Sequence, residues 1–164
     1  MRWKCLLICA VVLAATGVGV YLWQSTGGIP DDADELILFS VDGTKLHMEP
    51  EARGFAKDKE LLYECPVLGR VEITDPALRR EVIAAVKRDI RNPYSPQSKC
   101  FWPRHVLRIV KGGRTDDVVI CLQCHGYEVH RDGAPRVGPT PNIGESSKPL
   151  LNTILTDAGV PIAP

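Results

Sequence analysis

The stretch HVLRIVKGGRTDDVVICLQCHGYEVH, residues 105–130, predicts a β-hairpin that organises the whole domain. Apolar residues dominate on both sides of KGGR, residues 111–114, and Gly112-Gly113 supplies a tight turn because glycine tolerates positive φ at no steric cost. We therefore expect residues 117–124 to form mostly a strand, antiparallel to residues 105–110. Residues 125–130 continue the same strand-like pattern.

Side-chain alternation along this strand predicts two different faces. The nearly all-apolar face, which we expect in the core, carries Val118, Ile120, Leu122 and Cys124. The other face, which we expect to be less buried, carries Val119, Cys121, Gln123 and His125.

Two further strands are predicted before the hairpin. Residues 36–41 form a short apolar run that ends at an Asp42-Gly43 turn, after which residues 45–47 could return as a strand. Residues 67–73 form the second strand.

The clearest helix is predicted over residues 76–91. Asp75 can cap its N-terminus, and Pro76 suits the first helical position because no donor is needed there. Four apolar residues recur on one face: Leu78, Val82, Val86 and Ile90. The basic residues Arg79, Arg80, Lys87 and Arg88 are expected in solvent, and Asn92-Pro93 ends the helix.

A short C-terminal helix is predicted around residues 149–158, with Gly159 as its stop. The order of elements indicates an α+β fold: a small antiparallel sheet with one main helix and this short helix on one face. A single domain over residues 35–164 follows a Gly/Pro/Asp-rich linker at residues 24–34.

The N-terminus predicts a membrane anchor. Residues 5–23 carry no charge, close to the ~20 apolar residues that span a bilayer as a helix. Arg2 and Lys4 precede the run, which places the domain on the extracytoplasmic side of a single-pass protein. Residues 1–23 are thus expected to be a transmembrane helix; the alternative is a cleaved signal and a secreted or periplasmic chain.

The charge balance excludes a global attraction to nucleic acid. Lys plus Arg equals Asp plus Glu, at 20 each, so the formal net charge is zero. We expect no nucleic-acid partner, and we expect the chain to contact the membrane through its N-terminal helix.

Four cysteines belong to the exported part, namely Cys65, Cys100, Cys121 and Cys124. In an oxidising compartment they are disulfide candidates. A strand at residues 117–124 favours a Cys100–Cys121 pair, with Cys65 as a partner for Cys124.

CLQCH, residues 121–125, also matches the sequence motif of a covalent haem c site, with Cys121 and Cys124 as the thioether residues and His125 as the iron ligand. The three side chains would have to converge, whereas a strand would send Cys124 to the opposite face from Cys121 and His125.

Two other chemistries remain open for these cysteines. Cys100, His105, Cys121 and Cys124 form a Cys3His set that suits tetrahedral zinc. Cys121 and Cys124 could instead be a redox dithiol, although no helix pattern follows to lower a thiol pKa. His105, preceded by Arg104, is a further candidate for anion binding or acid–base chemistry.

Three segments, CFWPRHVLRIV, DDVVICLQC and KPLLNTILTDAGVPIAP, resemble a family of small exported bacterial proteins of unassigned function. The shared pattern is Cys-x-x-Pro-Arg-His, then Ile-Cys-x-x-Cys, over roughly residues 65–164. The resemblance implies one compact domain, no particular activity, and a His125 that is incidental to the pattern. We therefore expect a binding or structural module, stabilised by cysteine cross-links, with an unidentified protein or small-molecule partner, and not an enzyme.

Overall fold

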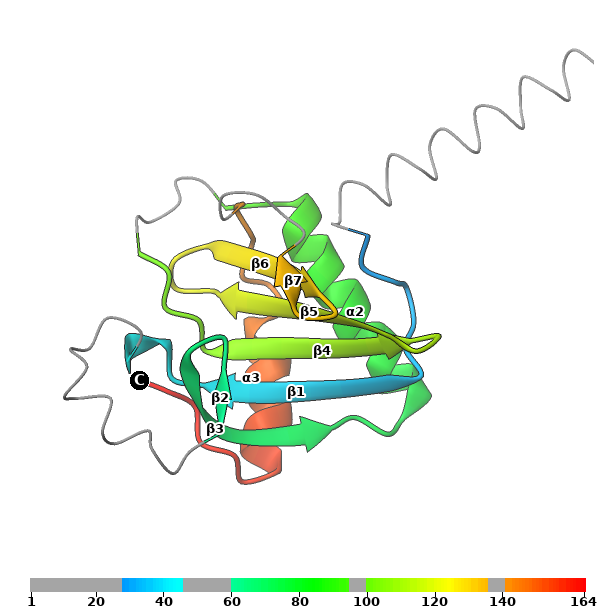
Figure 1. The fold of residues 1–164 in the computed structure, drawn as a ribbon, viewed down its shortest axis with the longest axis horizontal. Helices are drawn as coiled ribbons and strands as arrows, with labels where there is room; N and C mark the ends of the chain where they lie inside the picture. Colours follow the sequence, from blue (N-terminus) through cyan, green and yellow to red (C-terminus); the bar gives the residue numbers. More distant parts are fainter. Residues whose placement is uncertain (1–27, 46–59, 95–99, 136–140) are drawn as a thin grey trace, which may run out of the picture.

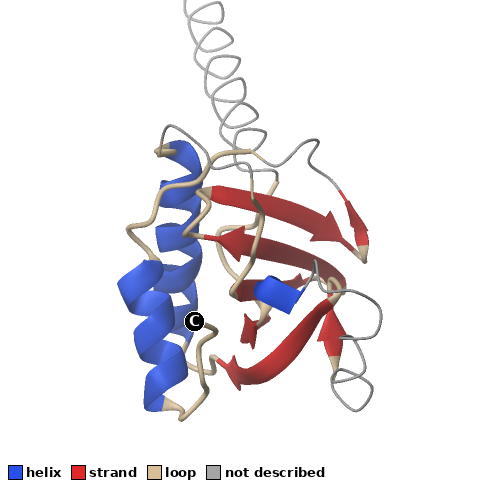
Figure 2. Ribbon diagram, turned by 90° about the vertical axis from the view of Figure 1, so that its left-hand side faces the viewer, coloured by secondary structure: helices blue, strands red, loops and turns tan. Residues whose placement is uncertain are grey.

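The computed structural model describes residues 28–45, 60–94, 100–135 and 141–164. They form a mixed fold in which helices cover one face of a curled antiparallel sheet (Figures 1 and 2). The helices are α2 (Pro76–Arg91) and α3 (Lys148–Asp157), with a 3-10 turn η1 (Gly43–Lys45). The predicted α+β class is confirmed, and the described sheet has seven strands.

The strand order is β2-β3-β1-β4-β5-β6-β7. The strands are β1 (Glu35–Val41), β2 (Leu61–Leu62), β3 (Cys65–Glu72), β4 (His105–Lys111), β5 (Arg114–Cys121), β6 (Gly126–Arg131) and β7 (Ala134–Pro135). The predicted strands at residues 36–41 and 67–73 are β1 and β3.

The return strand expected after Asp42-Gly43 is wrong as far as the structure describes it. Lys45 belongs to η1, and residues 46 and 47 lie outside the described residues. β1 pairs instead with β3 on one side and β4 on the other. A central strand satisfies both of its edges through long-range pairing, so the local turn signal did not identify its partners.

The β4–β5 hairpin is confirmed in register. His105 pairs with Ile120 at one end and Lys111 with Arg114 at the other. Gly112 and Gly113 have φ of 57° and 75°, the left-handed conformations that the two-residue turn requires.

The strand expected over residues 117–124 is confirmed as far as Cys121, and its continuation through residues 122–124 is wrong. β5 ends at Cys121, residues 122–125 make a turn, and β6 pairs back antiparallel with β5 from Gly126. His125 has φ of 54°, a left-handed conformation that no strand residue adopts. The apolar pattern therefore continues across a chain reversal, which periodicity alone could not reveal.

Helix α2 begins and ends where the sequence predicts. Asp75 accepts a hydrogen bond from Ala77 N, and Asn92 is the C-cap. Val82, Val86 and Ile90 are buried against the sheet. Lys87 is not in solvent as expected: it is 6% exposed, and its Nζ donates to Ile29 O (3.0 Å) and to the carboxylate of Asp31.

Helix α3 matches the expected C-terminal helix, and Gly159 follows it with φ of 71°. Asp89 of α2 holds the start of α3. Its carboxylate accepts from Ser146 N (3.1 Å) and Ser147 N (2.8 Å), so one helix supplies the anionic cap of the other.

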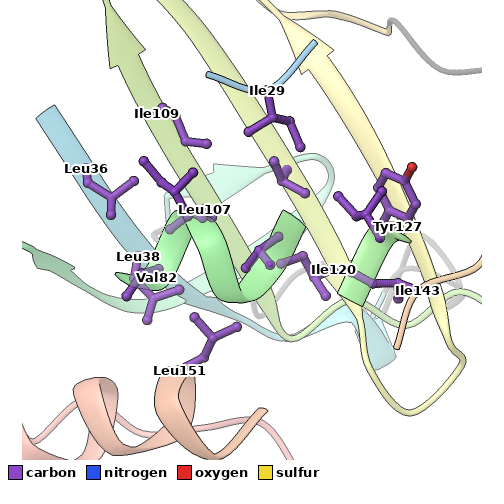
Figure 3. Packing of buried hydrophobic residues seen from close by; sticks show 14 of the residues in the cluster. Ile29, Leu36, Leu38, Val82, Leu107, Ile109, Ile120, Tyr127, Ile143 and Leu151 are labelled. Carbon is purple, nitrogen blue, oxygen red and sulfur yellow. The ribbon is translucent and has the colours of Figure 1, made fainter. Parts of the chain in front are cut away.

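Both faces of the central strands are buried. The larger cluster lies between sheet and helices, with Leu38, Leu107, Ile120, Val82 and Leu151 among its members (Figure 3). A smaller cluster on the opposite face comprises Phe39, Val41, Cys65, Val106 and Val119. Val119 is thus 1% exposed, although the alternation argument placed it on a less buried face.

The segment expected as a linker is described from residue 28 onward. Ile29 is buried in the larger cluster, and Asp34 N donates to Val110 O (2.8 Å). Residues 28–34 therefore pack against the domain. The predicted transmembrane helix, residues 1–23, lies outside the described residues, and no helix within them has the length and apolar character to cross a bilayer.

Candidate functional site

Three sulfur atoms meet at the turn between β5 and β6. Cys121 and Cys124 form a disulfide across this turn, with their Cα atoms 5.3 Å apart. Cys100 Sγ lies 3.1 Å from Cys124 Sγ. We call these three residues the cysteine cluster.

The expected disulfide pairing is therefore wrong. Cys100 does not pair with Cys121, and Cys124 does not pair with Cys65: Cys65 and Cys100 are the free thiols of the described residues. The reason lies in the backbone. The turn brings Cys124 back over the end of β5, where Cys124 N also donates to Cys121 Sγ (3.2 Å).

Main-chain hydrogen bonds bring Cys100 to this turn. Arg104 N donates to Ile120 O (3.1 Å), which aligns the segment before β4 with the end of β5. On its other side, Gly43 N donates to Pro103 O (2.9 Å). A Cβ on Gly43 would overlap the backbone of Pro103, so glycine is required for this close approach.

The turn is covered from the helix side. The His125 ring stacks on Tyr94, with ring centroids 4.3 Å apart. Ile143 N donates to His125 O (3.0 Å), and Gly126 forms an isolated bridge with Asn142. Residues that follow α2 and precede α3 thus hold the cysteine turn in place.

The sulfurs differ in access to solvent. Cys121 and Cys124 are 1% and 0% exposed, whereas Cys100 is partly exposed. Cys65 is fully buried in the smaller cluster, and burial, followed by the charges of Asp42 and Glu64, raises its pKa to about 12. Cys65 is therefore a protonated core thiol.

His105 faces away from the cysteine cluster. It pairs with Ile120, whose side chain is in the helix-side core, and its Nε2 lies 2.9 Å from Asn152 Oδ1 on α3. Burial lowers the pKa of His105 to about 4, so the ring is neutral at pH 7.

The Cys3His set does not assemble as four ligands. Cys100, Cys121 and Cys124 come together, but Cys121 follows Ile120 on β5 and successive strand side chains point to opposite faces. His105 therefore belongs to the other side of the sheet. With Cys121 and Cys124 bonded to each other, no three or more Cys, His, Asp or Glu side chains of the described residues are grouped so as to hold a metal ion.

The haem residues do not fit a covalent haem site. Attachment needs two accessible thiols beside a histidine that is open to iron. Cys121 and Cys124 are buried and bonded to each other, and the His125 ring lies against Tyr94.

A polar network on the face opposite the helices was missed by sequence reasoning. Arg108 donates to both oxygens of Asp117 (2.9 and 2.7 Å), and Tyr63 Oη donates to the same carboxylate (2.8 Å). Burial and the bond to Asp117 raise the pKa of Tyr63. The ring of His130, which lies beside Glu128, contacts Tyr63 with centroids 4.2 Å apart.

A signal for this network was present in the sequence. Asp116 and Asp117 directly precede the apolar run of β5 and are themselves buried, and buried carboxylates require partners. Asp116 has Arg131 (2.6 Å) and Arg114 (3.3 Å). Every oxygen of these two carboxylates accepts a hydrogen bond, on one face of the sheet for Asp117 and on the other for Asp116, so both sets of contacts are structural features of the sheet.

Comparisons with family models, with curated proteins and with solved structures find no match to this chain. The resemblance based on the Cys-x-x-Pro-Arg-His and Ile-Cys-x-x-Cys patterns stays a prediction.

Proposed function

We propose that this chain is an exported binding or structural module, tethered to the membrane by residues 1–23 and stabilised by a cysteine cross-link. The observation that carries the proposal is the Cys121–Cys124 disulfide, with the Cys100 thiol beside it. Disulfides persist in oxidising compartments, which agrees with export of the domain. The uncharged run of residues 5–23 supports the tether.

Two exposed aromatic residues support a role in binding. Tyr94, 53% exposed, contacts His125 at the cysteine turn, and Trp102, 37% exposed, lies two residues after Cys100. Exposed aromatic side chains are enriched where proteins bind partners. We place the partner surface at this end of the sheet.

Mass spectrometry of the full chain, purified in detergent from an export-competent host, tests the proposal. Alkylation without reduction, followed by peptide mapping, is expected to show Cys121 and Cys124 linked, with a mass lower by two hydrogens, and Cys100 and Cys65 alkylated once the chain is denatured. Cys65→Ser is the matched control, because it should leave the linked peptide unchanged.

Two results would overturn parts of the proposal. Alkylation of both Cys121 and Cys124 in the unreduced chain would remove the cross-link. A soluble mature chain that begins near residue 20 or 28 would replace the anchor with a cleaved signal.

The second candidate is a zinc-stabilised domain, favoured by the meeting of three sulfurs at one turn. If the disulfide is reduced, Cys100, Cys121 and Cys124 would provide three thiolate ligands of the kind that structural zinc prefers. His105 would not be the fourth. Native mass spectrometry separates the two functions, since zinc adds its mass to the folded chain and is lost on denaturation, whereas the disulfide survives denaturation.

A further inference from the structure

Cys124 has two sulfur neighbours, one of which is bonded to it. Besides the disulfide to Cys121, its Sγ lies 3.1 Å from Cys100 Sγ. Thiol–disulfide exchange proceeds by attack of a thiolate on a disulfide sulfur, so Cys100 is placed for this reaction. We propose that the cysteine cluster is an exchange site for small-molecule thiols and that Cys100 is its entry residue.

The internal step needs no outside reactant. The Cys100 thiol gives its proton to water, and its thiolate attacks Cys124 Sγ. A Cys100–Cys124 bond forms, the Cys121–Cys124 bond breaks, and the electron pair leaves on Cys121 Sγ, which takes up a proton. The step is a rearrangement with no net oxidation, because one disulfide replaces another.

Burial explains why an entry residue is needed. Cys121 and Cys124 are 1% and 0% exposed, so a thiolate in solution cannot reach either sulfur of the resting disulfide. After the internal step, the partly exposed Cys100 is one half of the disulfide. A thiolate RS⁻ then attacks Cys100 Sγ, forms a mixed disulfide and releases the Cys124 thiolate.

A second external thiolate completes the reaction. It attacks the sulfur of the RS group in the mixed disulfide, which yields RSSR and the Cys100 thiolate. Two RSH molecules have then lost two electrons, and the protein disulfide has gained them as two thiols. The reverse sequence, with RSSR as the oxidant, reforms the Cys121–Cys124 disulfide.

Cys65 provides a matched control within the same chain. It is fully buried on the same sheet, its Sγ lies near Tyr63 O (3.4 Å), and it has no role in the exchange. Removing Cys65 changes the number of thiols without touching the cysteine cluster.

The experiment follows reduction of the oxidised full chain, in detergent, by excess reduced glutathione. Samples are quenched by alkylation at timed intervals and analysed by mass. We expect Cys100→Ser to slow loss of the Cys121–Cys124 disulfide by roughly tenfold or more, and Cys65→Ser to react like the parent. Circular dichroism melts establish that both variants are folded. Equal rates in Cys100→Ser and the parent would overturn the proposal.

A trapping variant gives an independent readout. In Cys121→Ser, Cys100 has the one sulfur that the described residues leave beside Cys124, so oxidation by glutathione disulfide should yield a Cys100–Cys124 linked peptide. A Cys121→Ser chain that keeps both thiols alkylatable under those conditions would contradict the exchange.

This inference rests on the cross-link in the proposed function, but different results would overturn the cross-link and the exchange reaction. An unreduced parent chain with Cys121 and Cys124 both alkylatable removes the cross-link itself. A linked parent that Cys100→Ser does not slow leaves the module intact and removes only the exchange.

Discussion

Strand β5 has a turn at each end, and the two turns are built in different ways. At one end, Gly112 and Gly113 lie in open space: an added Cβ on either would meet no atom within 4 Å. At the other end, the turn at residues 122–125 holds a disulfide, a neighbouring thiol and a covered histidine. The first turn reverses the chain, and the second also assembles the candidate site.

The difference lies in what each turn requires. The glycine turn requires only backbone conformations that glycine adopts freely, so its requirement is local. The cysteine turn requires Cys100 from the segment before β4, Tyr94 from the segment after α2 and Ile143 from the segment before α3. Its stability is therefore tertiary, and substitutions at this end should have the larger effects.

The largest effect is expected for Cys124→Ser, which removes the sulfur common to both pairings. Loss of the cross-link and burial of a hydroxyl at this fully buried position should lower the free energy of unfolding by roughly 2–4 kcal/mol. Urea unfolding of the oxidised parent and variant measures the difference.

Cys121→Ser sharpens that measurement. If Cys100 replaces Cys121 as partner of Cys124, the closed loop grows from a separation of 3 residues to 24. In the chain-entropy account, the longer Cys100–Cys124 loop stabilises the folded chain by about 3.5 kcal/mol, and the shorter Cys121–Cys124 loop by about 2 kcal/mol. Cys121→Ser should therefore be milder than Cys124→Ser, and equal losses would argue against a second pairing.

The next effect is a dependence on pH at the cysteine end of β4. His105 has a folded pKa lowered to about 4 from 6.5, so the unfolded chain binds the proton more tightly. Its stabilisation is fully present above pH 6.5 and is lost as pH falls towards 4. We expect a loss on the order of 2–3 kcal/mol between about pH 7.5 and about pH 4.5.

His105→Gln isolates this contribution, because glutamine can bond Asn152 and does not titrate. Urea unfolding at both pH values should show a smaller loss in the variant, because the substitution removes only the imidazole of His105. A parent and a variant with the same pH dependence would show that His105 is not the group responsible.

The same contrast explains how much could be predicted from the sequence. The helix at Pro76–Arg91, its Asp75 cap and the Gly112-Gly113 hairpin were predicted correctly, because each depends on residues close in sequence. The cysteine turn was mistaken for strand for two reasons. Leu122 continues the apolar pattern of β5. The left-handed backbone conformation in the turn is adopted by His125 and not by a glycine, so no glycine marks the turn in the sequence.

Long-range polar partners were also beyond sequence reasoning. Lys87 looks like a surface residue until Ile29 O and Asp31 are known to lie beside it. Asp89 caps a helix that begins 59 residues later in the chain, which no local pattern reveals. For the candidate site, the sequence identified Cys100, Cys121 and Cys124, while their pairing and the separate position of His105 depended on the turn.

The smallest effect is expected at the glycine turn. Gly113 has φ of 75°, a conformation that costs an L residue roughly 1 kcal/mol, and no neighbouring atom would oppose a new side chain. Gly113→Ala should therefore lower the free energy of unfolding by about 1 kcal/mol through backbone strain alone. Gly113→Asn should cost less, because asparagine tolerates the left-handed region better than alanine. Both variants should keep the parent's rate of disulfide reduction by glutathione, since the turn lies at the far end of β5. A Gly113→Ala chain whose disulfide is reduced faster than the parent's would mean that the two ends are coupled through the strand, and the contrast between a local turn and a tertiary one would fail.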